Sequence, residues 1–148
     1  MTLKARIQED MKSAMRAGEK DKLANIRMVM AAIKQREVDE RIELDDVQVL
    51  SVIDKMVKQR RESIAQFAAG GRADLVAKEE AELRLLSAYL PVPLTEAELD
   101  ALISEAVSAT GAASIKDMGK VMAAIKAKAA GRADMGAVSA RIKARLST

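Results

Sequence analysis

The stretch from Pro91 to Glu98, Pro91-Val92-Pro93-Leu94-Thr95-Glu96-Ala97-Glu98, divides the sequence into two parts. Each proline lacks an amide donor and favours extended geometry in the residue before it, so no helix continues through this segment. Thr95 and Glu98 then stand three residues apart ahead of an apolar series, which is the spacing of a capping box. We therefore expect a domain at 1–90, a proline linker at 91–94 and a second domain at 95–148.

Four helices are expected before the linker. Apolar residues recur at helical spacing in four segments. The first segment runs from Thr2 to Gly18, the second begins at about Asp21, and the third runs from Asp45-Asp46 to the pair Gly70-Gly71. The fourth follows Asp74, which is expected to cap that helix. Their expected inward residues are Leu3, Ile7, Met11 and Met15; Leu23, Ile26, Met30 and Ile33; Val49, Val52, Ile53, Met56, Ile64 and Phe67; and Leu75, Leu83, Leu86 and Leu90. Glu79 interrupts the fourth series, and we expect it either at the rim or paired with an arginine such as Arg60 or Arg61.

Three helices are expected after the linker. The first runs from the Thr95 capping box to Gly111, the second opens with a weaker box at Ser114-Ile115-Lys116-Asp117, and the third is capped by Asp134. Their expected inward residues are Leu99, Leu102, Ile103, Ala106 and Val107; Met118, Val121, Met122, Ile125 and Ala129; and Val138, Ile142 and Leu146. The turn Gly71-Arg72-Ala73-Asp74 recurs as Gly131-Arg132-Ala133-Asp134, and the geometry of such a turn leaves both arginines free.

Composition supports an all-α fold, with an N-terminal bundle of about four helices and a smaller C-terminal three-helix domain. Of the 148 residues, 49% are hydrophobic and 32% charged, but only 1% are aromatic, which disfavours β architectures. The chain has no histidine and no cysteine, which excludes zinc fingers, disulfides and nucleophiles activated by imidazole. We expect no metal, no cofactor and no catalytic constellation in the isolated chain.

The sequence shows no membrane-spanning or targeting segment. Its longest uncharged stretch, 85–95, is far shorter than the ~20 residues a transmembrane helix needs. The opening residues lack the apolar core of a signal peptide, and Glu9 and Asp10 argue against a transit peptide. We therefore expect a cytoplasmic protein without a membrane partner.

Charge is unevenly distributed along the chain. Residues 1–90 carry a net charge of +1, residues 91–110 carry −4, and residues 111–148 carry +6. A basic body formed by the last two helices is typical of a nucleic-acid-binding protein. Most of its cations, however, lie near helix C-termini, where positive charge is stabilising without any partner.

Lys116 and Lys120 are the exception, because they lie in the first turns of the second C-terminal helix, where the helix dipole disfavours positive charge. In one continuous helix they share the face opposite the apolar stripe, with Gly119 beside them. These residues, with Arg132 in the next turn, are candidate contacts to phosphate groups. The alternative is that the lysines are merely solvated and that Gly119 permits close helix packing.

A second candidate surface lies in the N-terminal part. Arg27 and Lys34 fall on the solvent side of the second helix, and Lys58, Arg60 and Arg61 crowd one stretch of the third. These residues suit a salt-bridge network between helices, or a docking surface for a protein or RNA, equally well. No spacing of acidic residues here requires paired carboxylates for acid–base catalysis.

Several segments together resemble the GatB/YqeY family. They are 23–34 (LANIRMVMAAIK), 57–63 (VKQRRES), 71–75 (GRADL), 89–91 (YLP), 114–122 (SIKDMGKVM) and 131–134 (GRAD). The resemblance implies an all-helical protein whose C-terminal part is similar to the tail domain of the GatB component of the tRNA-dependent amidotransferase, a domain that helps that enzyme engage tRNA. It also implies a label of carbon–nitrogen ligase activity with glutamine as amide donor, for which this sequence offers no nucleophile or ATP site.

Two hypotheses remain open at this point. The first is a non-catalytic RNA-binding accessory module, with tRNA or another structured RNA as partner. The second is a helical protein–protein adaptor that presents the long third helix. An amidotransferase-like enzyme is the least favoured interpretation.

Overall fold

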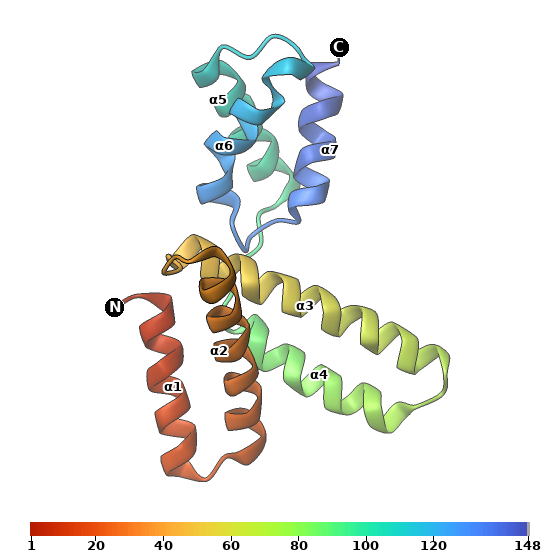
Figure 1. Ribbon diagram of the computed structural model, residues 1–148. Coiled ribbons are helices and arrows are strands. Elements are labelled where there is room, and N and C mark those ends of the chain that lie inside the picture. Colours follow the sequence, from red (N-terminus) through yellow and green to blue (C-terminus); the bar gives the residue numbers. More distant parts are fainter. Residues whose placement is uncertain (148) are drawn as a thin grey trace. The chain divides into compact units, whose positions relative to one another are not determined.

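The computed structural model describes residues 1–147, and within that range every regular element is a helix (Figure 1). The chain divides into two compact units, Met1–Leu90 and Pro91–Thr148. The expected all-α class is confirmed for the described residues. The first unit contains α1 (Leu3–Ala17), α2 (Lys20–Glu40), α3 (Asp46–Ala69) and α4 (Ala73–Ser87); the second contains α5 (Glu96–Thr110), the 3₁₀ turn η1 (Ile115–Asp117), α6 (Met118–Ala129) and α7 (Met135–Leu146).

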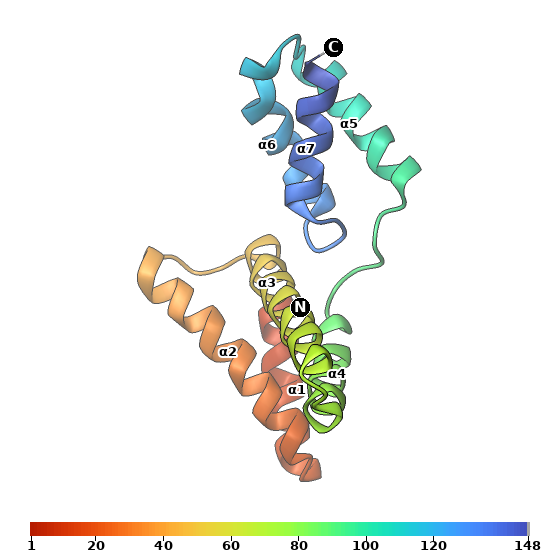
Figure 2. The ribbon, with the colours of Figure 1, turned by 90° about the vertical axis from the view of Figure 1, so that its right-hand side faces the viewer.

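The first unit is built from two antiparallel helix pairs. Helix α1 lies along α2, and α3 lies along α4 (Figure 1). Figure 2 looks almost along the axes of α3 and α4, so that the two helices overlap in the view. The buried core of the unit consists of Ile7, Ala14, Ile26, Val29, Ile33, Leu44, Val49, Val52, Ile53, Val57 and Leu86.

Helix ends follow the local sequence closely. Gly18 ends α1 with a left-handed backbone (φ 71°), as expected from its place after the apolar stripe. Asp45 caps α3 in a full capping box with Gln48, and Thr95 caps α5 in the box expected with Glu98. These termini are local devices, so the sequence alone is sufficient to predict them.

The expected core of α1 and α3 needs correction. Met15 is 52% exposed, whereas Ala14 is buried at 2%. Steps of four residues drift by about 40° each around a helix of 3.6 residues per turn, whereas Ala14, seven residues after Ile7, is only about 20° from it. Ile64 and Phe67 are half-buried, because their end of the α3–α4 hairpin extends away from α1 and α2 (Figure 1).

Asp74 does not cap α4, contrary to expectation. The helix begins at Ala73, and the N-cap residue is Arg72, whose side chain makes no capping hydrogen bond. The Asp74 carboxylate instead accepts two hydrogen bonds from the Arg72 guanidinium, at 3.3 and 3.2 Å. These bonds, together with backbone amides, hold the pKa of Asp74 below its usual range. Arg72 is therefore not free.

The second unit buries one face of each of its three α-helices. Its core contains Leu99, Ile103, Ala106, Val121, Ile125, Ala129, Val138, Ile142 and Leu146, all of which were expected to point inward. Asp134 caps α7 by accepting from the Gly136 amide at 3.3 Å. Gly71 and Gly131 both have φ 70°, so the repeated turn uses a left-handed glycine at the same place.

Candidate nucleic-acid interface

The outer face of α6 carries small and basic side chains. Gly119, Lys120, Ala123 and Ala127 are exposed, while the opposite face is buried in the core of the second unit. A methyl group added at Gly119 would meet no atom of the described residues within 4 Å. Within this unit, Gly119 therefore does not serve close helix packing, and the face around it is open.

Lys116 and Lys120 do not share one α-helix, as the sequence had suggested. Lys116 lies in η1, and α6 begins two residues later at Met118, so the angular relation expected from a continuous helix does not hold. The Asp117 carboxylate accepts hydrogen bonds from the amides of Ala113 (3.0 Å) and Ser114 (3.4 Å), and these bonds lower the pKa of Asp117. The Asp117 carboxylate thus stabilises the backbone turn that precedes η1.

Lys120 has only a weak partner. Its Nζ lies 3.9 Å from Asp117 Oδ1, and the lysine side chain is 70% exposed. Such an exposed contact contributes little and leaves the ammonium hydrated. Lys116, Lys126 and Lys143 make no ion pair within residues 1–147. These four lysines of the second unit remain available to a partner.

Several other cations of this unit are paired with helix α5. Lys128 Nζ lies 3.4 Å from Glu105 Oε1, and Arg141 Nη1 donates to Asp100 Oδ1 at 2.6 Å. Folding therefore places the acidic segment 91–110 against the basic segment 111–148. The expected basic body is corrected to a mixed surface, on which free positive charge is confined to a few lysines.

Arg132 is occupied by contacts within its own unit. Its Nε donates to the Val92 carbonyl oxygen at 2.8 Å, and its Nη2 lies 3.7 Å from Glu98 Oε2. The Arg132 carbonyl in turn accepts from the Leu94 amide at 2.8 Å. This residue, expected to be free for a phosphate, fastens the start of the second unit to the turn between α6 and α7.

The basic residues proposed for the N-terminal surface have different environments. Arg27, Lys34 and Arg61 are exposed. Lys58 Nζ lies 3.5 Å from Asp54 Oδ2, within the same helix. Arg60 is only 16% exposed and is committed to α4, so these five residues do not act as one free surface.

Arg60 joins α3 to two glutamates of α4. Its Nη1 donates to Glu79 Oε2 at 2.8 Å and lies 2.7 Å from Glu82 Oε2, an ion pair without hydrogen-bond geometry. The expected pairing of Glu79 with an arginine is thereby confirmed. The Arg60 cation compensates two partly buried carboxylates between the helices, which is a structural role.

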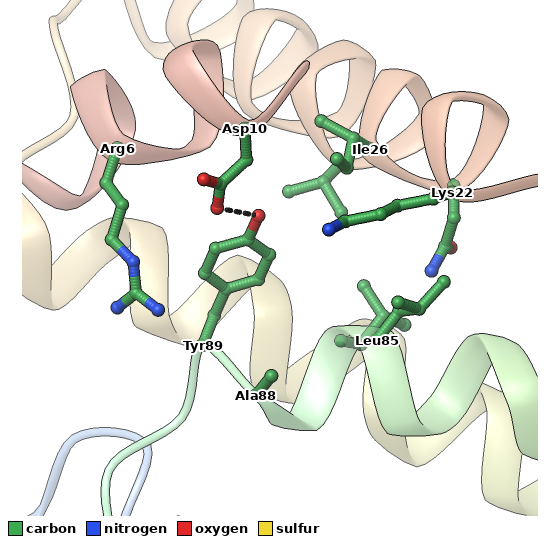
Figure 3. Close-up of a pocket in the computed structure, with 10 residues that line it drawn as sticks. Arg6, Asp10, Lys22, Ile26, Leu85, Ala88 and Tyr89 are labelled. Carbon is green, nitrogen blue, oxygen red and sulfur yellow. Dashed lines mark hydrogen bonds between the residues drawn. The ribbon is translucent and has the colours of Figure 1, made fainter. Parts of the chain in front are cut away.

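Sequence reasoning missed a polar pocket in the first unit. It lies among α1, α2 and the end of α4, and its lining includes Arg6, Asp10, Lys22, Asn25 and Tyr89 (Figure 3). The Tyr89 hydroxyl donates to Asp10 Oδ2 at 2.6 Å across 79 positions of sequence. Only two features hinted at the pocket: Tyr89 is the single tyrosine of the chain, and Asn25 interrupts an apolar helix face.

Residues 1–147 contain no cluster of three or more acidic side chains that could hold a metal ion. None of the helices in that range is both long enough and apolar enough to span a membrane.

Comparison with known proteins identifies relatives over almost the whole chain. Residues 4–146 match the sequence pattern of the YqeY-like protein family. The chain is 42% identical to "Altered inheritance of mitochondria protein 41, mitochondrial" of Eremothecium gossypii, over 73% of this chain and 63% of the relative. Proteins of the same name are 38% identical in Kluyveromyces lactis (67% of this chain, 55% of the relative) and 36% identical in Pyrenophora tritici-repentis (84% and 71%).

These relatives contradict the expected cytoplasmic location, because each is named as a mitochondrial protein. That expectation rested on the first residues of this sequence. The chain spans only 55–63% of the length of the Eremothecium and Kluyveromyces proteins, so those residues do not decide the compartment. Neither the family description nor the relatives' names state amide transfer or RNA binding.

Proposed function

The chain belongs to the YqeY-like protein family, and from that premise we propose that it is a non-catalytic accessory module that binds tRNA or another structured RNA. The observation that carries this proposal is the exposed surface of η1 and α6, where Lys116 of η1 and Lys120 and Lys126 of α6 remain exposed. The same side of the helix offers only Gly119 and alanines between the charges. A phosphate backbone can approach such a face without steric obstruction.

The chemistry of this face favours recognition of phosphates over bases. The second unit contains no aromatic residue, so no ring is available on which a base could stack. Around α6, Lys120 and Lys126 lie about 120° apart with Gly119 and Ala123 between them. Ammonium groups spaced in this way suit successive phosphates of a folded RNA, with little dependence on sequence.

Arg132 stays within the proposal only as a supporting residue. Its contacts to Val92 and Glu98 fix the turn that follows α6. The expected phosphate contacts are therefore about three, one from each of Lys116, Lys120 and Lys126. Such a number gives a slope of about −2 to −3 when log affinity is plotted against log salt concentration.

The test is fluorescence anisotropy of the intact chain with bulk tRNA across a salt series, with duplex DNA as competitor. The double variant Lys116→Glu/Lys120→Glu should weaken tRNA binding by at least about tenfold, because two attractive contacts become repulsive. Lys78→Glu reverses one charge at an exposed position of α4, half the charge change of the double variant, and is the control for charge reversal outside the proposed face. It should change affinity by less than about twofold.

Two outcomes would overturn the proposal. One is tRNA affinity, with its salt slope, that is the same in the double variant and in the Lys78→Glu control. The other is the absence of binding even at low salt, which would favour a protein–protein adaptor.

A further inference from the structure

We infer that the pocket among α1, α2 and the end of α4 binds a small aliphatic carboxylic acid that carries an amino or hydroxyl group beside its carboxylate. The pocket has a volume of about 200 Å³ and lies wholly within the first unit (Figure 3). It shares no residue with the proposed RNA-binding face. Its walls combine cations, unsatisfied acceptors and apolar side chains, and each of these limits the ligand.

Two cations select an acidic group. The Arg6 guanidinium carbon lies 5.2 Å from the centre of the Tyr89 ring, which holds the side chain at the pocket edge by a cation–π contact. Figure 3 shows the Lys22 side chain extending between Ile26 and Leu85 toward the side on which Asp10 and Tyr89 meet. Within the described residues, Lys22 has only a 3.8 Å contact to Glu19. A carboxylate is the natural partner for two such donors.

Two acceptors select a donor group beside that carboxylate. Asn25 is 4% exposed, and its Nδ2 donates to the Glu82 carbonyl at 3.2 Å. Its Oδ1 is buried and has no hydrogen-bond partner among residues 1–147. The reversed amide orientation would place oxygen against oxygen, so this assignment is fixed by the Glu82 carbonyl.

Asp10 supplies the second acceptor. The Tyr89 hydroxyl occupies its Oδ2, which leaves Oδ1 for a ligand. An amino or hydroxyl group of a ligand has an acceptor in each of these two residues, both of which line the pocket. Acceptors without a donor favour a ligand that satisfies them over an analogue that lacks the donor, most strongly at the buried oxygen of Asn25.

Size and apolar lining define the rest of the molecule. The pocket volume of about 200 Å³ is small. That is below the range of about 300–1,000 Å³ typical of drug-sized and cofactor sites. Ile26, Val29, Leu85 and Leu86 line the apolar side of the pocket. A short branched aliphatic chain fits this wall, and a nucleotide does not.

Tyr89 makes the test specific, because the chain has one tyrosine and no tryptophan. Intrinsic tyrosine fluorescence therefore reports on this pocket. The intact protein is titrated with leucine, with the α-hydroxy analogue of leucine, with isocaproic acid, which lacks the α donor, and with isopentylamine, which lacks the carboxylate. Saturation with leucine or its hydroxy analogue, at concentrations below about 10 mM, and much weaker responses to the other two are expected.

Variants connect the signal to the residues. Lys22→Met keeps the aliphatic stem and should weaken binding by roughly 3- to 10-fold. Lys20→Met makes the same change on an exposed lysine of α2 that does not line the pocket, and should leave binding unchanged. Asn25→Ala should bring the affinities for leucine and isocaproic acid closer together.

Three results would overturn the inference. They are a linear, non-saturating response to all four probes, equal losses in the Lys22 and Lys20 variants, and equal binding of isocaproic acid and leucine by the unmodified protein. Circular dichroism of each variant confirms that the helices remain folded. Because tRNA binding is measured separately, failure here leaves the proposed RNA-binding function untouched.

Discussion

Two sets of ion pairs, one in each unit, differ in how far their side chains are buried. In the first unit, Arg60 and its partners Glu79 and Glu82 are 16%, 15% and 22% exposed and join two helices from within. In the second unit, Arg141 and Asp100 are 33% and 66% exposed, although their 2.6 Å separation is just as short. Distance alone therefore does not reveal what an ion pair contributes.

Exposure determines what each kind of pair can do. Removing one member of a partly buried pair leaves the other charge poorly hydrated and without compensation, which is strongly destabilising. An exposed pair contributes little and is screened by salt. The cation of an exposed pair can therefore leave its carboxylate and bind another anion with little loss of free energy. The Arg60 network of the first unit thus fixes helix packing, whereas the exposed pairs of the second unit keep charge that a polyanion could recruit.

The largest expected effect tests the buried network. Arg60→Met should lower the free energy of unfolding by about 2–3 kcal/mol, because Glu79 and Glu82 lose their shared cation. Arg61→Met, at the adjacent exposed position, is the matched control and should change it by less than about 0.5 kcal/mol. Urea denaturation of both variants measures the difference. Equal losses would show that burial does not separate the two arginines.

A second effect concerns the bond between Tyr89 and Asp10. Tyr89→Phe should cost about 1–2 kcal/mol at neutral pH, because the Asp10 carboxylate loses a charge-assisted hydrogen bond. Burial, followed by the bond to Asp10, raises the pKa of Tyr89 well above its usual range.

The raised pKa also predicts a dependence on pH. Tyr89 ionises more easily in the unfolded chain than in the folded protein. Its stabilisation is therefore complete below a pH of about 10 and is lost as the pH rises above that value. Thermal unfolding as a function of pH should show this alkaline loss in the unmodified protein and not in Tyr89→Phe. The same alkaline loss in both proteins would contradict the assignment.

A third effect compares the two copies of the Gly-Arg-Ala-Asp turn. Arg132→Met should destabilise the second unit by about 1 kcal/mol, because the Val92 carbonyl loses its donor. Arg72→Met removes only contacts to the exposed Asp74 and should cost less than about 0.5 kcal/mol. Amide hydrogen exchange of each unit measures the two changes. A large loss of tRNA affinity in Arg132→Met without loss of stability would make Arg132 a phosphate contact.

The smallest effect is that of salt. Raising the salt concentration from about 0.05 to 0.5 M should reduce the stability of the second unit by a few tenths of a kcal/mol, because its pairs are exposed. The network of Arg60 should be less sensitive, since its charges are largely shielded from solvent ions. Hydrogen exchange followed in both units at the two salt concentrations distinguishes them. Equal sensitivity would remove the contrast between the units.

The candidate site was only partly predictable. Exposed positions for Lys116, Gly119 and Lys120 followed from the apolar pattern of the opposite helix face. The 3₁₀ turn at Lys116 did not, because one turn of capping sequence is compatible with both kinds of helix. The hydrogen bond from Arg132 to the Val92 carbonyl joins residues 40 positions apart, and nothing in the sequence around either residue predicts it.

The pocket of the first unit could not be predicted for the same reason. Asp10 and Tyr89 are 79 positions apart, and neither belongs to a motif. The unpartnered oxygen of Asn25 becomes visible only when the Glu82 carbonyl lies opposite its amide nitrogen. Such constellations depend on which helices pack together and not on spacing along one helix.

The sequence by itself determined the all-α class and the ends of most helices, because capping boxes, left-handed glycines and 3.6-residue periodicity act within a few residues of the chain. Only the tertiary structure decided which charges stay free. Lys128 and Arg141 meet acids of α5, and Arg60 meets α4, through contacts between residues 19 to 45 positions apart. Coulombic partners are chosen by proximity in space, and proximity across helices is set by packing of the whole unit.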